Sequence, residues 1–302
     1  MKMYKNVREG VNMIYYILIF LAALGCALNF AVTKVYQLNQ GNSIGSGIIF
    51  NCLVGLAGSL IYFVVCGFKI EMTVFSVIMS VLFTLFLGIY TIIGFKIMSI
   101  GSMAVYTVFL MLGGMILPYF YGLLFLDEEI TVLKVIALLL MTVAIILQNN
   151  GEKKRGKALF YILCIGVFIL NGLVSIVSKA HQIYPQYETV SDNGFVLLKN
   201  LMRFLMFGSM IPFVSKKGEK IFQIKPKMYI VIMFSALISS IAYYFQLVCA
   251  SYLPATVQYP VMSGGTIVFT ALLGMICFKE KISKRQILCL FLCIASTAIF
   301  VV

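Results

Sequence analysis

The chain has 302 residues, of which 62% are hydrophobic and only 11% are charged, and its mean hydropathy is +1.05. Soluble globular proteins are about 45–50% apolar and about 25% charged, so no soluble fold could bury this much apolar surface. Most of the excess in the net charge of +13 lies in the short segments 153–157, 216–227 and 279–285. Basic loops beside apolar runs are typical of contacts with anionic membrane lipid and disfavour nucleic acid as a partner.

Uninterrupted apolar stretches recur along the whole chain, and the first shows no clear cleavage site of a signal peptide. A hydrocarbon core about 30 Å thick needs about 20 apolar residues per helix, and backbone groups inside it must bond within the chain. The alternating pattern of a barrel strand is absent, so we expect an all-α membrane protein. Ten transmembrane helices are predicted near 13–33, 44–66, 74–95, 102–126, 131–147, 158–178, 195–214, 228–250, 254–278 and 284–302.

The polar stretch from Gln148 to Lys157 divides the chain into two halves, 1–150 and 151–302, which resemble each other. Because each half holds an odd number of spans, the two copies must cross the bilayer in opposite directions. This predicts two inverted five-helix repeats, an architecture characteristic of secondary transporters. The matched positions are Thr33-Lys34-x-x-Gln37 with Ser178-Lys179-x-x-Gln182, Gly113 with Gly265, and Glu128-x-Ile130-Thr131 with Glu280-x-Ile282-Ser283.

Short motifs at the ends of both halves resemble those of a known transporter group. They are Ala242-Tyr243, Pro254-Ala255-Thr256, Tyr259-Pro260, Gly264-Gly265 and Glu280-Lys281-Ile282-Ser283, with a weaker copy in Tyr90, Gly113-Gly114, Pro118 and Glu128-Glu129-Ile130-Thr131, and the pair Arg203-Phe204. The chain thereby resembles the drug/metabolite transporter superfamily, specifically its ten-helix EamA-like members. The resemblance implies efflux or exchange of a small metabolite by alternating access. It also implies a central cavity lined by all spans except the fifth and tenth.

Two cations inside the seventh span, Lys199 and Arg203, are the leading site candidates. They stand four residues apart, on one helix face, and each costs at least about 2.5–3.5 kcal/mol unless it faces water or a partner. No Asp or Glu lies inside any predicted span, so we expect the substrate to bring the negative charge. An anionic or zwitterionic metabolite such as an amino acid or a phosphorylated compound fits this expectation. The other predicted substrate-binding residues are Lys34, Lys179, Asn29, Asn171, Tyr106, Tyr243, Gln246, Gln258 and Tyr259.

Several polar residues also have a purely structural interpretation. Lys34 and Lys179 end the first and sixth spans, where each could either snorkel to the interface or place a cation at a mouth of the cavity. Arg203 could likewise snorkel to a lipid headgroup. Glu128 and Glu280 precede the fifth and tenth spans, with Thr131 and Ser283 as expected N-caps, so the helix dipole favours them. His181 is interpreted as an incidental residue of a loop.

A membrane-embedded enzyme and a channel are the competing functions. Paired carboxylates, His clusters and filter sequences are not evident, so we predict no enzyme, no cofactor and no metal. The eight cysteines show no metal-ligand spacing. We expect a multi-pass protein of the cell membrane whose substrate, direction, coupling ion and oligomeric state stay open. The count of basic residues places both termini outside and the family resemblance places them inside; we favour the count because the loops are short.

Overall fold

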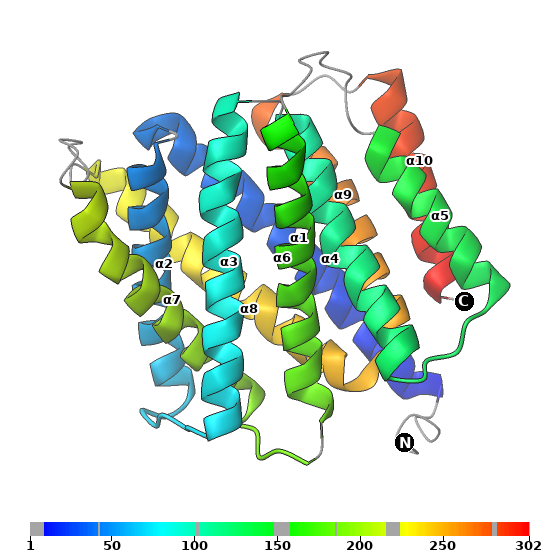
Figure 1. The fold of residues 1–302 in the computed structure, drawn as a ribbon, viewed down its shortest axis with the longest axis horizontal. Helices are drawn as coiled ribbons and strands as arrows, with labels where there is room; N and C mark the ends of the chain where they lie inside the picture. Colours follow the sequence, from blue (N-terminus) through cyan, green and yellow to red (C-terminus); the bar gives the residue numbers. More distant parts are fainter. Residues whose placement is uncertain are drawn as a thin grey trace.

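The computed structural model describes residues 9–41, 43–100, 103–147, 158–184, 186–215, 224–279 and 283–301. Throughout these ranges the chain forms helices joined by turns, and no strand is present. The helices are α1 (Glu9–Gln40), α2 (Ile44–Val65), α3 (Val74–Ile100), α4 (Met103–Phe125), α5 (Val132–Leu147), α6 (Ala158–Ile183), α7 (Asp192–Ser215), α8 (Pro226–Tyr252), α9 (Ala255–Phe278) and α10 (Lys284–Val301), as Figure 1 shows.

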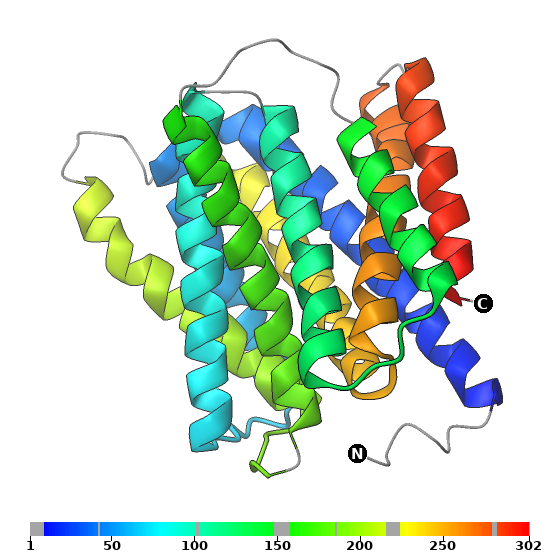
Figure 2. The same ribbon diagram turned by 45° about the vertical axis from the view of Figure 1, so that its right-hand side comes forward.

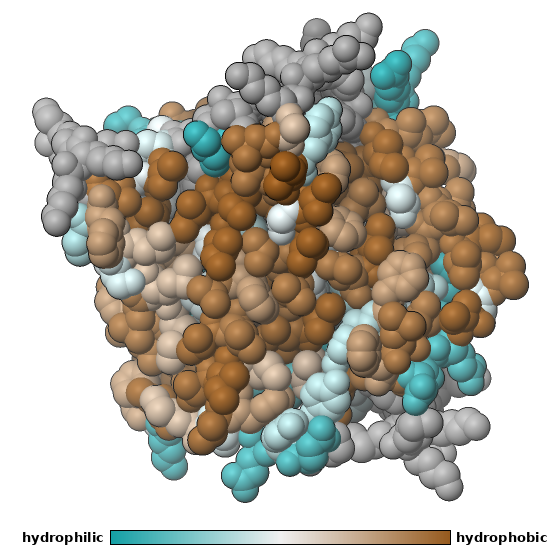
Figure 3. Space-filling model, in the orientation of Figure 1, coloured by the Kyte–Doolittle hydropathy of each residue, from teal (hydrophilic) through white to brown (hydrophobic). Residues whose placement is uncertain are grey.

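Nine of these helices are long and apolar enough to cross a membrane, and α5, with 16 residues, is apolar but shorter. At 1.5 Å per residue α5 extends about 24 Å, somewhat less than a hydrocarbon core of about 30 Å. The prediction of an all-α, multi-pass membrane protein is therefore confirmed. Apolar residues colour most of the face in Figure 3, and hydrophilic residues gather near its upper and lower edges. Such a surface suits lipid in the middle and water at both ends.

Several helices run beyond their predicted apolar stretch. The helix α1 continues to Gln40, seven residues past the predicted end at 33, and α6 continues to Ile183 instead of 178. Hydropathy marks only the part of a helix that meets lipid, whereas backbone hydrogen bonding continues wherever the chain can sustain it. Polar residues near these ends are therefore helical.

Most of the packed helix pairs of the first half have a counterpart when the two halves of the chain are exchanged. The helix α1 packs on α8 and α9, and the corresponding α6 packs on α3 and α4. If each helix is exchanged for its counterpart in the other half (α1 for α6, α2 for α7 and so on), the packed pairs α2–α7, α4–α9 and α5–α10 remain the same pairs. Figures 1 and 2 show α5 and α10 side by side at the edge of the bundle, away from α2 and α7. The fifth and tenth helices are thus peripheral.

The same backbone turn closes α4 and α9. Asp127 and Lys279 have left-handed φ values of 49° and 52°, and they stand as far apart in sequence as the matched Gly113 and Gly265. A non-glycine residue with positive φ is uncommon, so its recurrence at matching positions is a specific sign of repetition.

Candidate functional site

The two cations of α7 point into the bundle. The Nζ of Lys199 lies 3.9 Å from the ring centroid of Tyr243 and 5.9 Å from that of Phe83. The Nη2 of Arg203 donates to Asn51 Oδ1 at 2.6 Å. Among the described residues, these cations interact with aromatic rings and an amide, and with no carboxylate. The alternative that Arg203 reaches a lipid headgroup is therefore wrong in this conformation.

Some side chains around these cations lie deep among protein atoms and yet keep accessible surface. Arg203, Tyr90, Tyr106 and Cys26 all have this property, although they come from four different helices. Arg203 and Tyr90 are close enough to interact electrostatically. These four residues of α1, α3, α4 and α7 are thus partly exposed, in the region where a central cavity is predicted.

The predicted aromatic and amide residues join neighbouring helices. Tyr243 and Ser178 share a hydroxyl–hydroxyl bond of 2.9 Å between α8 and α6, and the Tyr259 hydroxyl donates to the Ser175 carbonyl at 2.6 Å. Asn171 donates to the carbonyl of Leu110 at 2.8 Å. These side chains are thus largely engaged by protein partners, which fixes where their rings and amides stand.

Asn29, Gln246 and Gln258 complete the predicted neutral set. Asn29 Oδ1 accepts from the Ser235 hydroxyl at 2.7 Å. Gln258 is fully buried; its Nε2 donates to the carbonyl of Gln246 at 2.8 Å, while its Oε1 has no partner among the described residues. A buried acceptor without a donor costs about 1–3 kcal/mol. Gln258 is therefore the member of this set with spare hydrogen-bonding capacity.

The matched lysines stand in unlike environments. Lys179 has no exposed surface, and its Nζ donates to the carbonyls of Ala250 and Leu253, each at 2.6 Å. Snorkelling of Lys179 to the interface is therefore wrong, because α6 continues past it and packs it against the end of α8. Lys34 is half-buried, with its Nζ 4.4 Å from the centroid of the Phe278 ring.

Glu128 caps a helix of the other half of the chain and not the helix that follows it. Its Oε1 accepts the backbone N–H of Ala255 at 2.6 Å and its Oε2 that of Thr256 at 2.8 Å, at the start of α9. The expectation that it would serve the start of α5 is therefore wrong. Thr131 caps α5 as predicted, by accepting from the N–H of Lys134 at 3.3 Å.

The N-terminus of α10 carries the predicted capping arrangement. Gln286 Oε1 accepts from the N–H of Ser283 at 2.8 Å, and Ser283 Oγ accepts from the N–H of Gln286 at 3.3 Å. This reciprocal pair is a capping box. Glu280, the sequence match of Glu128, lies outside the described residues.

His181 is a buried residue of α6 and not an incidental loop residue. Its ring stacks on Phe195 with centroids 3.8 Å apart, and its Nε2 lies 2.8 Å from Ser76 Oγ. The interpretation was wrong because the sixth helix continues to Ile183. His181 joins the ends of α3, α6 and α7, which is a packing role.

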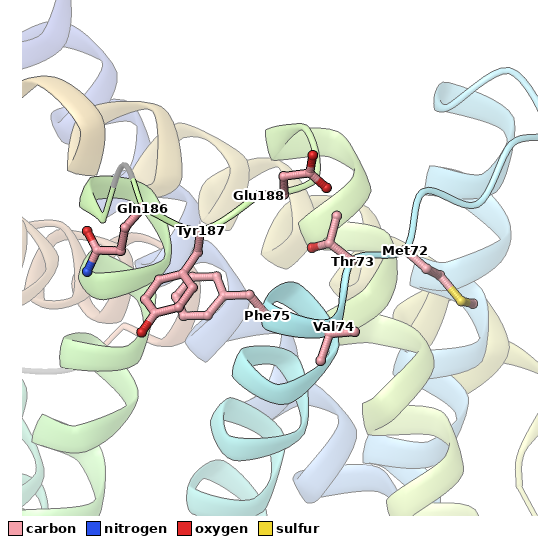
Figure 4. A pocket seen from close by; sticks show the side chains of 7 residues that line it. All are labelled: Met72, Thr73, Val74, Phe75, Gln186, Tyr187 and Glu188. Carbon is pink, nitrogen blue, oxygen red and sulfur yellow. The ribbon is translucent and has the colours of Figure 1, made fainter.

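A separate recess of about 420 Å³ opens at the end of α3. Figure 4 shows its lining, in which the rings of Phe75 and Tyr187 stack with centroids 4.3 Å apart. Its other residues are Met72, Thr73, Val74, Gln186 and Glu188, and none of the predicted site residues is among them. The recess lies in the turns at one face of the bundle, away from the residues predicted to bind substrate. We therefore do not take it as the substrate site and place the candidate site at the cations of α7.

Comparison with known proteins shows what the second half of the chain and the overall fold are similar to. Residues 158–302 match the model of the EamA-like transporter family, whereas no curated protein matches the chain. Among 28 matching chains of solved structures, one described as "Crystal structure of protein" has a TM-score of 0.71 and 12% identity, covering 94% of this chain and 97% of that chain. At that identity the likeness shows the fold alone. Residues 158–302, the second half of the chain, therefore match the EamA-like transporter family, as the resemblance predicted.

Proposed function

We propose that this protein is an exporter or exchanger of a small anionic or zwitterionic metabolite, such as an amino acid or a phosphorylated compound, and that it works by alternating access. The observation that carries the proposal is the pair Lys199 and Arg203. Both cations lie at depth inside the bundle, among aromatic and amide groups, without a carboxylate partner in the described structure. A bound anion would offset the cost of holding these charges away from water.

Arg203 is the residue best suited to hold the anion. One nitrogen of its guanidinium is engaged by Asn51, and its buried Nε has no partner among the described residues. A planar guanidinium can bind a carboxylate or phosphate through two N–H groups and stays charged at any accessible pH. Tyr106, Tyr243 and Tyr259 would form aromatic walls, and Gln258 would supply a neutral acceptor.

Two inverted five-helix repeats, 1–150 and 151–302, form part of the proposal. The counterpart pairs of packed helices and the repeated turn at Asp127 and Lys279 support it. Exchange of the conformations of the two halves, which a pseudo-twofold axis in the membrane plane would relate, would then open the protein to one side of the membrane or the other, with the α7 cations near the boundary between the halves. The cell membrane is the location that we propose for this multi-pass protein.

Counterflow in liposomes tests the proposal. Purified protein is reconstituted, the vesicles are loaded with unlabelled amino acids, carboxylates or phosphorylated metabolites, and entry of the labelled compound is followed. We expect saturable counterflow for at least one anionic or zwitterionic compound, and a large loss of apparent affinity in Arg203→Gln. A folded Arg203→Gln protein with the affinity and rate of the parent for every transported compound would contradict the assigned role.

A further inference from the structure

One turn of the structure is held by two charged side chains from outside it. The turn joins α8 to α9 through Leu253 and Pro254, and it lies at the lower edge of the bundle in Figure 1. The carboxylate of Glu128 accepts the N–H groups of Ala255 and Thr256, which begin α9. Since a helix N-terminus carries partial positive charge, an anion there is stabilised both by hydrogen bonds and by the helix dipole.

The other side of the same turn is held by Lys179. Its Nζ donates to the carbonyls of Ala250 and Leu253, at the C-terminus of α8, where partial negative charge favours a cation. Glu128 is close enough to Lys179 to act on it electrostatically. Residues from α6 and from the turn after α4 thus fasten the end of α8 and the start of α9 together.

The chain around Glu128 is shaped for this contact. Asp127 adopts its left-handed conformation directly before Glu128, and the N–H of Glu128 bonds back to the carbonyl of Gly122 at 3.2 Å. A Cβ on Gly122 would lie 2.6 Å from Glu128 Oε2 and 3.1 Å from the Cβ of Ala255. The absence of a side chain at position 122 therefore makes room for the carboxylate to reach α9.

Further bonds between helices close the same face. Ser178 meets Tyr243, and the Ser251 hydroxyl donates to Gln182 Oε1 at 3.1 Å, so α6 and α8 are joined at two more points. Tyr121 and Tyr184 share a bond of 2.7 Å between the last turns of α4 and the end of α6. This face is thus tied across α4, α6, α8 and α9.

Both ends of one bond between α6 and α8 can be compared with matching positions among the described residues of the first half. Thr33, which matches Ser178 in sequence, bonds to the carbonyl of Asn29 within its own helix. Thr91, which matches Tyr243 by the spacing of the matched glycines, bonds to the carbonyl of Leu87 in its own helix. In addition, α6 packs on α8, whereas α1 and α3 are not among the helix pairs in substantial contact. Within the described residues, the packing of α6 on α8 therefore has no counterpart of comparable extent between α1 and α3.

From this asymmetry we propose that Glu128 and Lys179 form a latch, which holds the face at the α8–α9 turn closed, and that each transport cycle requires the latch to release. The inference rests on the proposed transport function, because only an alternating-access carrier must open this face. Glu128 and Lys179 are positioning residues in this scheme and do not touch the substrate. The structure then represents the state that is closed at the α8–α9 turn.

A cysteine reporter tests the latch without any substrate. Ser175 is buried, with 8% exposure, and lies one turn of α6 before Lys179, so Ser175→Cys is introduced after the eight native cysteines have been replaced. Modification by a water-soluble maleimide is timed in protein reconstituted in nanodiscs. In Glu128→Gln the charge is lost and only one of the two N–H groups keeps an acceptor, because the amide NH2 cannot accept, so we expect modification to accelerate by about tenfold or more. Gly122→Ala, which displaces the carboxylate, should act in the same direction, and the exposed neighbour Glu129→Gln is the matched control.

A cross-link provides the complementary measurement. Cysteines at Gln182 and Ser251, joined through two disulfides by a short bis-methanethiosulfonate reagent that releases methanesulfinate, should abolish counterflow, and reduction should restore it. Unchanged labelling in both folded latch variants, or full counterflow by completely cross-linked protein, would overturn the latch. Accelerated labelling in Glu128→Gln together with no counterflow of any compound by the parent would instead support the latch and defeat the proposed transport function.

Discussion

Replacing Gly55 by alanine should damage stability and substrate binding together. Gly55 lies on α2 where that helix meets the backbone of α7: an added Cβ would stand 2.6 Å from the backbone nitrogen of Phe204 and 3.0 Å from the carbonyl oxygen of Asn200. Backbone atoms in a packed helix cannot rotate away as the end of a flexible side chain can. The substitution must therefore push α2 and α7 apart.

The required movement is comparable with the tolerance of a hydrogen bond. Ordinary contact with a Cβ begins at 3.4 Å, so relief of the clash needs a separation of roughly 0.8 Å. Asn51 stands one turn from Gly55 on the same face of α2, and Arg203 is next to Phe204. A bond of 2.6 Å between Arg203 and Asn51 would lengthen to roughly 3.4 Å, beyond the range of about 2.7–3.2 Å for N–H···O bonds.

Two measurable losses follow from this movement. Overpacking of this kind costs about 1–3 kcal/mol of stability, and a hydrogen bond to a charged group is worth about 1.5–3 kcal/mol. If Arg203 loses its orientation, the apparent affinity for substrate should fall by about tenfold or more, since each 1.4 kcal/mol corresponds to about a tenfold change.

Thermal unfolding in detergent and counterflow in liposomes measure the two losses. The chain has no Trp, so unfolding is followed with a dye that reacts with buried cysteines such as Cys164 and Cys249 as they become exposed. Gly208→Ala is the matched control, because it lies on α7 and its Cβ would have only the Cys52 sulfur nearby, at 3.7 Å. Equal unfolding temperatures and equal affinities for Gly55→Ala and Gly208→Ala would refute the reasoning.

Three further predictions concern other parts of the bundle. Gly113→Ala should lower the unfolding temperature by several degrees, because its Cβ would collide with the backbone carbonyl of Phe168; an unchanged unfolding curve would contradict this contact. Lys199→Gln should reduce counterflow of an anionic substrate by about tenfold or more while the protein stays folded, since a buried cation is removed from the site; unaltered kinetics would exclude a role in binding. The N–H of Ser191 donates to Glu71 at 2.8 Å and lowers the pKa of that carboxyl below its ordinary value of 4.5. This contribution to stability is complete above the ordinary pKa and is lost as the pH falls through the lowered pKa, so unfolding scans from pH 6 to pH 3 should show a smaller loss in Glu71→Gln than in the parent.

Local properties of the sequence determined the class of the protein and the approximate place of its helices. Long apolar stretches predict transmembrane helices because the bilayer core offers no hydrogen-bonding partner to an open backbone. Caps such as Thr131 and Ser283 were also predictable from local sequence, because an N-cap bonds within its own first turn. The interior location of Lys199 and Arg203 was expected from the cost of a cation facing lipid.

Contacts between distant segments could be decided only by the tertiary structure. Lys179 and Lys34 match in sequence, yet one is buried against the end of α8 and the other lies beside Phe278, because helix packing differs at the two ends of the bundle. Glu128 was expected to act on the helix that follows it, but the left-handed turn at Asp127 directs it to α9, 127 residues away along the chain. Hydropathy and spacing report on one helix at a time, and the partner of a polar side chain depends on which helices lie next to each other.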